Sequence, residues 1–132
     1  MQSRKNQKPA VKDDEIVYFA YGSNMSSLRL QARVPSARRM INAVLTGHQL
    51  RFHKHSHVDG SAKCDAYHTG LAEDKVLGVI FSFQRSEKPA LDSAEGLGEG
   101  YEIKRVRVVT ADNQWVDAYT YVATDIDVSL RP

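Results

Sequence analysis

Residues 16–25 read Ile16-Val17-Tyr18-Phe19-Ala20-Tyr21-Gly22-Ser23-Asn24-Met25. The first part of this segment, up to Tyr21, contains β-branched, aromatic and small residues, which suit a buried β-strand. Gly22-Ser23-Asn24 then breaks the strand, because these residue types tolerate unusual backbone angles and often cap helices. The segment therefore predicts a strand that ends in a tight loop.

A helix is predicted directly after this loop, from Met25 to Arg33. Met25, Leu28 and Ala32 have helical spacing, and Pro35 ends the pattern. A loop that opens into a helix directs free backbone N–H groups toward one point, so it can bind a carboxylate, a phosphate or an oxyanion. The alternative is a turn, capped by serine or asparagine, that binds nothing.

The composition indicates one ordinary globular domain. The chain has 132 residues, of which 42% are hydrophobic and 26% charged, which is enough for one modest core. We expect a flexible leader over residues 1–15, the domain over 16–124 and a short tail over 125–132. A single cysteine, Cys64, and the lack of a long apolar run favour a cytoplasmic protein without a membrane span. A net charge of +2 is too small to indicate nucleic acid by itself.

The middle of the chain predicts strands that bend at glycines. Ile41 to Phe52 reads as a strand region interrupted at Gly47. His68 to Ala72 and Val76 to Phe83 read as a hairpin, whose second strand is nearly all apolar and hence buried on both faces. Gly78 in that strand marks a bulge, a bend or a close backbone approach. Such strands favour a closed or strongly coiled sheet.

The last part of the chain predicts a short helix and two strands. The helix spans Ser86 to Ala94, with Ser86 as a candidate N-cap and Leu91 facing inward. Strands follow from Tyr101 to Thr110 and from Gln114 to Thr124. The whole order predicts an α+β domain built on one mixed sheet.

Glu95 is the second candidate for chemistry. It falls at the last helical position, because Gly96 is a typical residue just beyond a helix C-terminus. A carboxylate there faces the negative end of the helix dipole, which suits a general base or acid if the group is buried. The alternative is an exposed helix-end residue, with Glu99 or Glu102 equally suited to the role.

Three histidines alternate at His53, His55 and His57. In an extended chain they share one face, where three imidazoles could bind a metal. Arg51 and Lys54 add positive charge, and no acidic ligand lies among them. The pattern therefore favours a solvated strand end, and we expect no metal.

The segment Tyr18 to Met25, followed by Arg29, resembles the signature of the gamma-glutamylcyclotransferase-like family. A second segment resembles another motif of the same family. It reads Leu91-Asp92-Ser93-Ala94-Glu95-Gly96 and is followed by Gly100-Tyr101. The resemblance covers roughly residues 16–123, and two spaced motifs are more specific than a single glycine pattern. Between the motifs, the positions that also fit are Pro35, Gly47, Leu50, Phe52, Gly70 and residues 76–79.

The resemblance implies a small mixed β-barrel with short flanking helices. It also implies a cofactor-independent enzyme of the acyltransferase type, as in glutathione metabolism. In that reaction the α-amine of a γ-glutamyl group attacks its own γ-carbonyl, which releases 5-oxoproline and an amine or amino acid. Glu95 falls on the position of the acid/base residue. The substrate-binding residues implied by the resemblance are Tyr18, Phe19, Ala20, Tyr21, Gly22, Ser23, Asn24 and Tyr101.

Relatives usually continue past the last strand with a segment that helps to cover the pocket. We therefore expect an open sheet edge at residues 114–124 and a homodimer in which the partner covers it. The expected partner is a small γ-glutamyl molecule, rather than nucleic acid or a membrane. Two alternatives stay open. One is a binding protein that holds a small carboxylate or acyl-glutamate ligand without turnover. The other is a basic barrel that binds nucleic acid through Lys104, Arg105 and Arg107.

Overall fold

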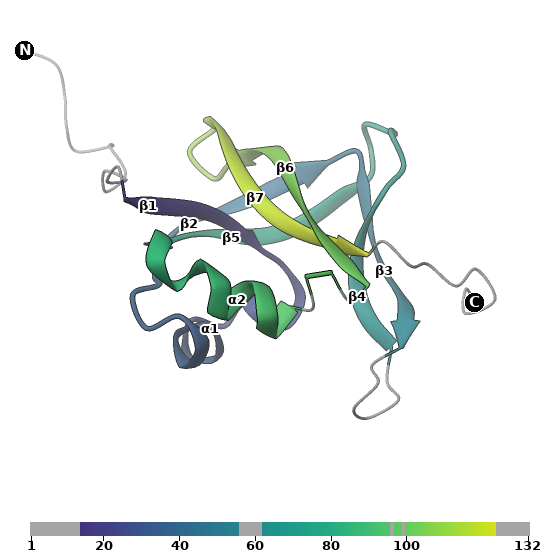
Figure 1. Cartoon of the computed structure of the whole chain (residues 1–132). Coiled ribbons are helices and arrows are strands. Elements are labelled where there is room, and N and C mark those ends of the chain that lie inside the picture. Colours follow the sequence, from purple (N-terminus) through teal and green to yellow (C-terminus); the bar gives the residue numbers. More distant parts are fainter. Residues whose placement is uncertain (1–13, 56–61, 96, 99, 124–132) are drawn as a thin grey trace, which may run out of the picture.

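The structure is a computed structural model that describes residues 14–55, 62–95, 97–98 and 100–123, with the backbone alone at 23–24, 52–55 and 62–64. It confirms an α+β fold in which a closed barrel of order β1-β5-β2-β6-β7 stands beside a two-stranded sheet, β3-β4 (Figure 1). The strands are β1 (Glu15–Ala20), β2 (Arg38–Thr46), β3 (His48–His55), β4 (Ala62–His68), β5 (Lys75–Gln84), β6 (Tyr101–Thr110) and β7 (Trp115–Ala123). The helices are α1 (Ser27–Arg33) and α2 (Lys88–Glu95), each preceded by a short 3₁₀ turn, η1 (Gly22–Met25) and η2 (Arg85–Glu87).

The barrel closes where the first and last strands meet. β1 is antiparallel to β5 and parallel to β7, with Tyr18 opposite Tyr119. β7 also pairs along its length with β6. The predicted open edge at the last strand is therefore wrong, because β7 has a neighbour on both sides.

Alternation along β1 divides the apolar side chains between two cores. Tyr18 and Ala20 belong to a cluster that includes Leu30 of α1 and Leu91 of α2, so this core lies between the barrel wall and the helices. Figure 1 shows both helices on the same side of the barrel. Phe19, fully buried, belongs to the second cluster, which fills the barrel. Its other members include Ala43, Leu45, Val76, Ile80, Val106, Val108, Ala118 and Val122.

Gly78 confirms the predicted close approach of two backbones. A Cβ atom added to it would lie 2.6 Å from two ring carbons of Phe19 and nearer still to the carbonyl oxygen of Ala20. Such distances are shorter than real carbon contacts, so any larger residue would push β1 and β5 apart. Most of β5 is buried on both faces as predicted, although Leu77 is 69% exposed.

The first helix differs from its prediction. It begins at Ser27, after η1, and its N-cap is Ser26, whose side chain accepts a hydrogen bond from Arg29 N at 3.3 Å. Leu28 is 83% exposed, whereas Leu30 is fully buried. The 3₁₀ turn shifts the helical phase relative to a helix that starts at Met25, and this turns a different face toward the core.

The predicted hairpin of residues 68–83 is wrong. β4 ends at His68 and pairs with β3, while β5 pairs with β1 and β2. The intervening loop folds back on Gly47, whose carbonyl oxygen accepts from Thr69 N and Gly70 N at 2.9 and 3.0 Å. Gly47 has φ +73° and separates β2 from β3, as the predicted interruption requires.

The second helix agrees with its prediction at its C-terminal end. It ends at Glu95, and Leu91 is fully buried. Its start is later than predicted, because Ser86 lies in η2 and the α-helix begins at Lys88. Within the part of the chain that the structure describes, no helix is long and apolar enough to cross a membrane.

Candidate active site

Glu95 and the end of β1 come together, although they lie far apart in the sequence. Glu95, the last residue of α2, is partly buried. Burial is the main cause that raises the pKa of both Tyr21 and Tyr121, and the charge of Glu95 adds the smallest contribution to each. Glu95 therefore lies within electrostatic range of the tyrosine that follows β1.

Tyr21, directly after β1, is locked by two hydrogen bonds. Its hydroxyl donates to the carbonyl oxygen of Tyr121 at 2.5 Å and accepts from Ala66 N at 3.2 Å. Burial raises the pKa of Tyr21 well above its usual range, and the nearby carboxylate of Asp65 raises it further. The hydroxyl therefore stays protonated and fixes β1 to β4 and β7.

Tyr121 joins α2 to the barrel. Its hydroxyl donates to Oδ1 of Asp92 at 2.5 Å, and Lys88 holds the other oxygen of that carboxylate at 2.8 Å. Burial raises the pKa of Tyr121, and the hydrogen bond to Asp92 adds to the effect. Asp92 lies one helical turn before Glu95, so this contact sets where the end of α2 lies.

Tyr101, predicted to line the pocket, belongs to the same group. It is the first residue of β6 and is 6% exposed. It is close enough to Tyr21 to contribute to the raised pKa of that tyrosine. Tyr101 and Glu95 therefore both lie within electrostatic range of Tyr21.

The glycine turn continues directly from Tyr21. Gly22 has φ +63°, a conformation that favours glycine, and it opens η1. Ser23 and Asn24 lie in η1, and only their backbone is described. Because α1 starts later behind its own Ser26 cap, the turn is not the N-terminus of an α-helix, contrary to expectation.

The side chains of Tyr18, Phe19 and Ala20 are buried in the two cores. Tyr18 packs edge-on against Phe83 and Tyr121, with ring centroids 6.2 and 5.8 Å apart. These three positions hold the strand that carries the turn. Their predicted contact with a substrate stays a prediction.

A second polar group surrounds Asp65 and His48. Asp65 of β4 is 1% exposed, accepts a hydrogen bond from Ala123 N at 2.8 Å, and acts electrostatically on both Tyr21 and His48. His48 Nδ1 lies 2.9 Å from the carbonyl oxygen of Thr46, and its Nε2 lies 3.0 Å from Lys104 Nζ. A carbonyl only accepts and an ammonium only donates, so Nδ1 carries the proton and the ring is neutral. Burial lowers the pKa of His48, and the charge of Lys104 lowers it further.

The remaining candidates do not converge. Among the described residues no cluster of histidine, cysteine or acidic side chains could hold a metal ion; the side chains of His53 and His55, and all of His57, lie outside them. Adjacent strand residues alternate between faces, so Lys104 points to the opposite face of β6 from Arg105 and Arg107. The three cations considered for nucleic acid therefore do not form one continuous stripe.

Sequence reasoning missed Asp92, Tyr121 and Asp65. The sequence could have indicated Asp92, because it lies three residues before Glu95 and hence on nearly the same helix face. No sequence pattern indicated Tyr121 or Asp65, since the alternation of a strand does not say which residue of a neighbouring element a tyrosine or an aspartate contacts.

Comparison with known proteins supports one family. The sequence matches the family model described as "Gamma-glutamyl cyclotransferase, AIG2-like" over residues 18–131. The human gamma-glutamylcyclotransferase is 30% identical over 122 residues, which cover 87% of this chain and 63% of the relative. The mouse protein of the same name is 29% identical over 121 residues, covering 86% and 62%. The chain thus spans less than two thirds of the length of these relatives.

Solved structures show the same fold. The crystal structure of a human protein described as uncharacterized superimposes with a TM-score of 0.79 at 28% identity, covering 87% of this chain and 70% of that one. A structure described as a gamma-glutamyl cyclotransferase has a TM-score of 0.78 at 27% identity, covering 86% and 69%. The barrel and its helices are therefore shared with a structure described as a gamma-glutamyl cyclotransferase.

Proposed function

The chain belongs to the gamma-glutamyl cyclotransferase, AIG2-like family, and from this premise we propose that it converts a γ-glutamyl amide or γ-glutamyl amino acid to 5-oxoproline and a free amine. The relatives in the comparison carry the name of this reaction. Glu95 is the proposed general base and acid, and the turn from Tyr21 to Asn24 is the proposed substrate-binding segment.

The reaction needs positioning more than a strong catalyst. The α-nitrogen of the substrate attacks its own γ-carbonyl carbon, so a new C–N bond closes the five-membered ring. The C–N bond to the departing amine then breaks. Because the nucleophile and the carbonyl belong to one molecule, holding them in a near-attack shape supplies roughly 7–11 kcal/mol of the barrier.

Protons move in two steps through one carboxylate. Two protons move in all: the α-ammonium group loses one to Glu95 before its nitrogen attacks, and the attacking nitrogen loses the second as it becomes the ring amide nitrogen. The leaving nitrogen takes up both, one from Glu95 as the C–N bond breaks and the other as it departs as an ammonium ion. Atoms and charge balance without an external reagent, so the proposed chemistry needs no cofactor. The backbone N–H groups of η1 are the proposed donors to the substrate carboxylate or to the oxygen that develops negative charge.

The proposal rests mainly on the family to which the chain belongs. The electrostatic action of Glu95 on Tyr21, at the end of the strand that leads into the Gly22 turn, supports it. The anchor of α2 on Tyr121 adds support, because a general base must be held within hydrogen-bond reach of its proton. Tyr21 and Tyr121 themselves stay protonated, so neither competes with Glu95 for the role of base.

The test is a direct assay for product. The purified chain is incubated with γ-glutamyl amino acids and with γ-glutamylamines, and 5-oxoproline is measured by mass spectrometry. Release above the rate of heat-inactivated protein is expected for at least one compound class. Saturable binding of such compounds by calorimetry with no 5-oxoproline from any of them would instead support a binding protein that uses the same site.

A further inference from the structure

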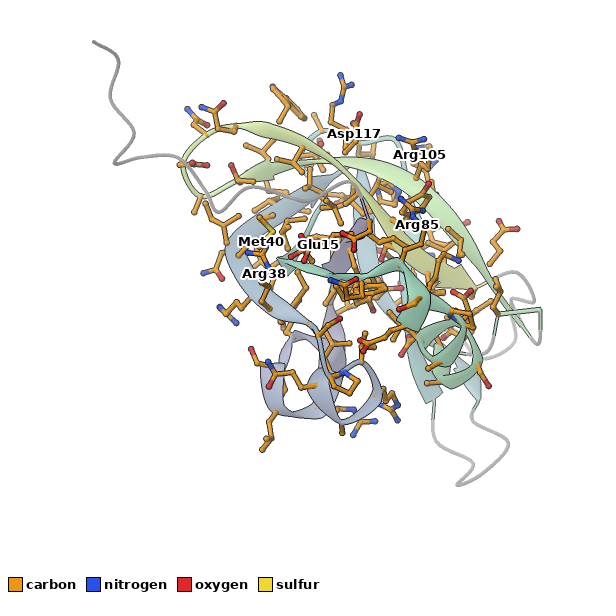
Figure 2. All side chains as sticks on the ribbon, turned by 60° about the vertical axis from the view of Figure 1, so that its left-hand side comes forward. Glu15, Arg38, Met40, Arg85, Arg105 and Asp117 are labelled. Atoms are coloured by element: carbon orange, nitrogen blue, oxygen red, sulfur yellow. The ribbon has the colours of Figure 1, made fainter. Side chains whose placement is uncertain are left out.

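We propose that a small cleft at the start of β1, remote from Glu95, binds a phosphate group through the guanidinium groups of Arg85 and Arg105. The cleft has a volume of about 170 Å³ and lies between the first residues of β1 and the middle of β7. Figure 2 shows Arg85 and Arg105 on one side of Glu15, with Arg38 on the other side. The residues that line it are Glu15, Ile16, Val17, Arg85, Arg105, Asp117, Ala118 and Tyr119.

Each of the two carboxylates that line the cleft forms an ion pair with an arginine outside its lining. Glu15 Oε1 accepts from Arg38 at 3.0 Å, and Asp117 Oδ1 accepts from Arg107 at 2.9 Å. The bond from Arg107 holds the pKa of Asp117 below its usual range, so this group stays charged and paired. Among the described residues, neither Arg85 nor Arg105 forms an ion pair with a carboxylate, although the charge of Arg105 adds to that of Arg107 in lowering the pKa of Asp117. The guanidinium groups of Arg85 and Arg105 are therefore left over for a ligand.

Contacts within the protein hold the side chain of Arg105 and the backbone of Arg85 at the cleft. The guanidinium of Arg105 lies 5.5 Å from the centre of the Tyr119 ring, a cation–π contact that keeps the side chain over the cleft. Arg85 follows the end of β5, and its backbone N–H donates to the carbonyl oxygen of Asp14 at 2.7 Å.

The segment that carries Arg85 is also tied from the other side. Ser36 Oγ accepts from Gln84 N at 2.8 Å and donates to Glu87 Oε1 at 2.7 Å. The backbone N–H of Ser36 donates to the same carboxylate oxygen at 3.0 Å. Arg85 therefore emerges from a fixed backbone, which lowers the entropy lost when a ligand binds.

Charge, shape and size together select the ligand class. Guanidinium groups donate paired hydrogen bonds that match the oxygens of a phosphate group. A phosphate monoester carries a charge of about −1.5 to −2 near pH 7, which matches the two arginines left over. The volume of about 170 Å³ is smaller than the ~300–1,000 Å³ of typical ligand pockets, so it suits one phosphate group rather than a whole organic molecule. That group comes either from free phosphate or from a small phosphate monoester.

This cleft is separate from the proposed active site. It lies at the start of β1, whereas Tyr21 follows the other end of this six-residue strand. At a rise of about 3.3 Å per residue the two ends lie on the order of 20 Å apart. A phosphate here would bind independently of the chemistry at Glu95.

The experiment is a titration of the ¹⁵N-labelled full chain with inorganic phosphate at pH 7.5, followed by amide NMR. Saturable shifts are expected at Ile16, Val17, Arg85 and Tyr119. The variant Arg85→Gln/Arg105→Gln should lose saturation, and each single variant should weaken binding roughly three- to tenfold. Arg39→Gln is the matched control, because Arg39 is exposed and its hydrogen bond goes to Asn42 outside the cleft.

The source of the phosphate group is tested in a second arm with glycerol 3-phosphate. Tighter binding of the monoester assigns a monoester as the ligand, and equal or weaker binding assigns free phosphate. The proposal is overturned if sodium chloride at the same ionic strength produces the same shifts. It is also overturned if the double variant, with an unchanged unfolding midpoint, still binds phosphate like the parent chain.

Discussion

The hydroxyl of Tyr121 on β7 donates a hydrogen bond of 2.5 Å to Oδ1 of Asp92 on α2. Among the described side chains this contact ties the helix that ends in Glu95 to the wall of the barrel. Lys88 holds the second oxygen of the same carboxylate, so the whole connection is charge-assisted.

Tyr121→Phe should lower the free energy of unfolding by about 1.5–3 kcal/mol, because it removes a hydrogen bond to a charged group and leaves the Asp92 carboxylate partly buried without it. Asp92→Ala should destabilise the protein similarly, and the double variant should cost less than the sum of the two. Urea unfolding measures all three. Tyr119→Phe, a neighbouring tyrosine on β7, is the control and should change stability little. Strict additivity of the two substitutions would show that the contact contributes nothing.

Glu95→Gln should lower the rate of 5-oxoproline release by on the order of 10²-fold or more, since the amide keeps the size of the side chain but cannot accept the proton. Substrate binding and the unfolding midpoint should be largely retained. Glu102→Gln, an exposed carboxylate at the start of β6, is the matched control and should keep the parent rate. Equal rates for Glu95→Gln and the parent would remove Glu95 from the mechanism.

Gly22→Ala should cost about 1–2 kcal/mol of stability, because φ is +63° and a Cβ atom is disfavoured there. It should also weaken substrate binding, since the turn holds the proposed donors. Gly70→Ala is the matched control, because it places the same backbone strain at φ +76° in a loop. A Cβ atom added at Gly70 would have its nearest neighbour, an atom of the His68 ring, 4.0 Å away. Thermal unfolding should therefore report similar losses for both variants, whereas only Gly22→Ala should raise KM. A parent-like KM for Gly22→Ala would separate the turn from the substrate.

The stability of the protein should fall as the pH drops below about 6.5, in part because of His48. Burial and the charge of Lys104 lower the pKa of His48 in the folded protein below its ordinary value of 6.5. In that window the unfolded chain binds more protons, so acid favours unfolding. Asp65 opposes the shift, and the exposed His68, 4.9 Å away ring to ring, adds to it.

The measurement compares urea unfolding at pH 7.5 and pH 5.5 for the parent and for His48→Gln. Carboxylates contribute to the loss in both proteins, so the prediction concerns the difference between them, with the smaller loss in His48→Gln. His68→Gln serves as the control and should lose nearly as much stability as the parent. An identical pH dependence in His48→Gln and the parent would contradict the role assigned to His48.

Several features could be read from local sequence. The strand that leads into Gly22, both ends of β6, the C-terminal end of α2, the close approach at Gly78 and the break at Gly47 all follow from residue types and their spacing. These features depend on backbone preferences and on alternation within one element, which neighbours in the chain decide. The two family motifs also marked Glu95 and Tyr21 as residues of interest.

The tertiary structure alone decided which elements meet. β4 pairs with β3 and not with β5, Leu30 and not Leu28 faces the core, and the hydroxyl of Tyr121 donates a hydrogen bond to Asp92. A strand pattern is the same whichever neighbour it pairs with, and a short helix can turn either of two apolar residues inward. The choice is made by the burial of apolar surface and the pairing of buried polar groups across the whole barrel, which are properties of the assembled chain and not of any one segment.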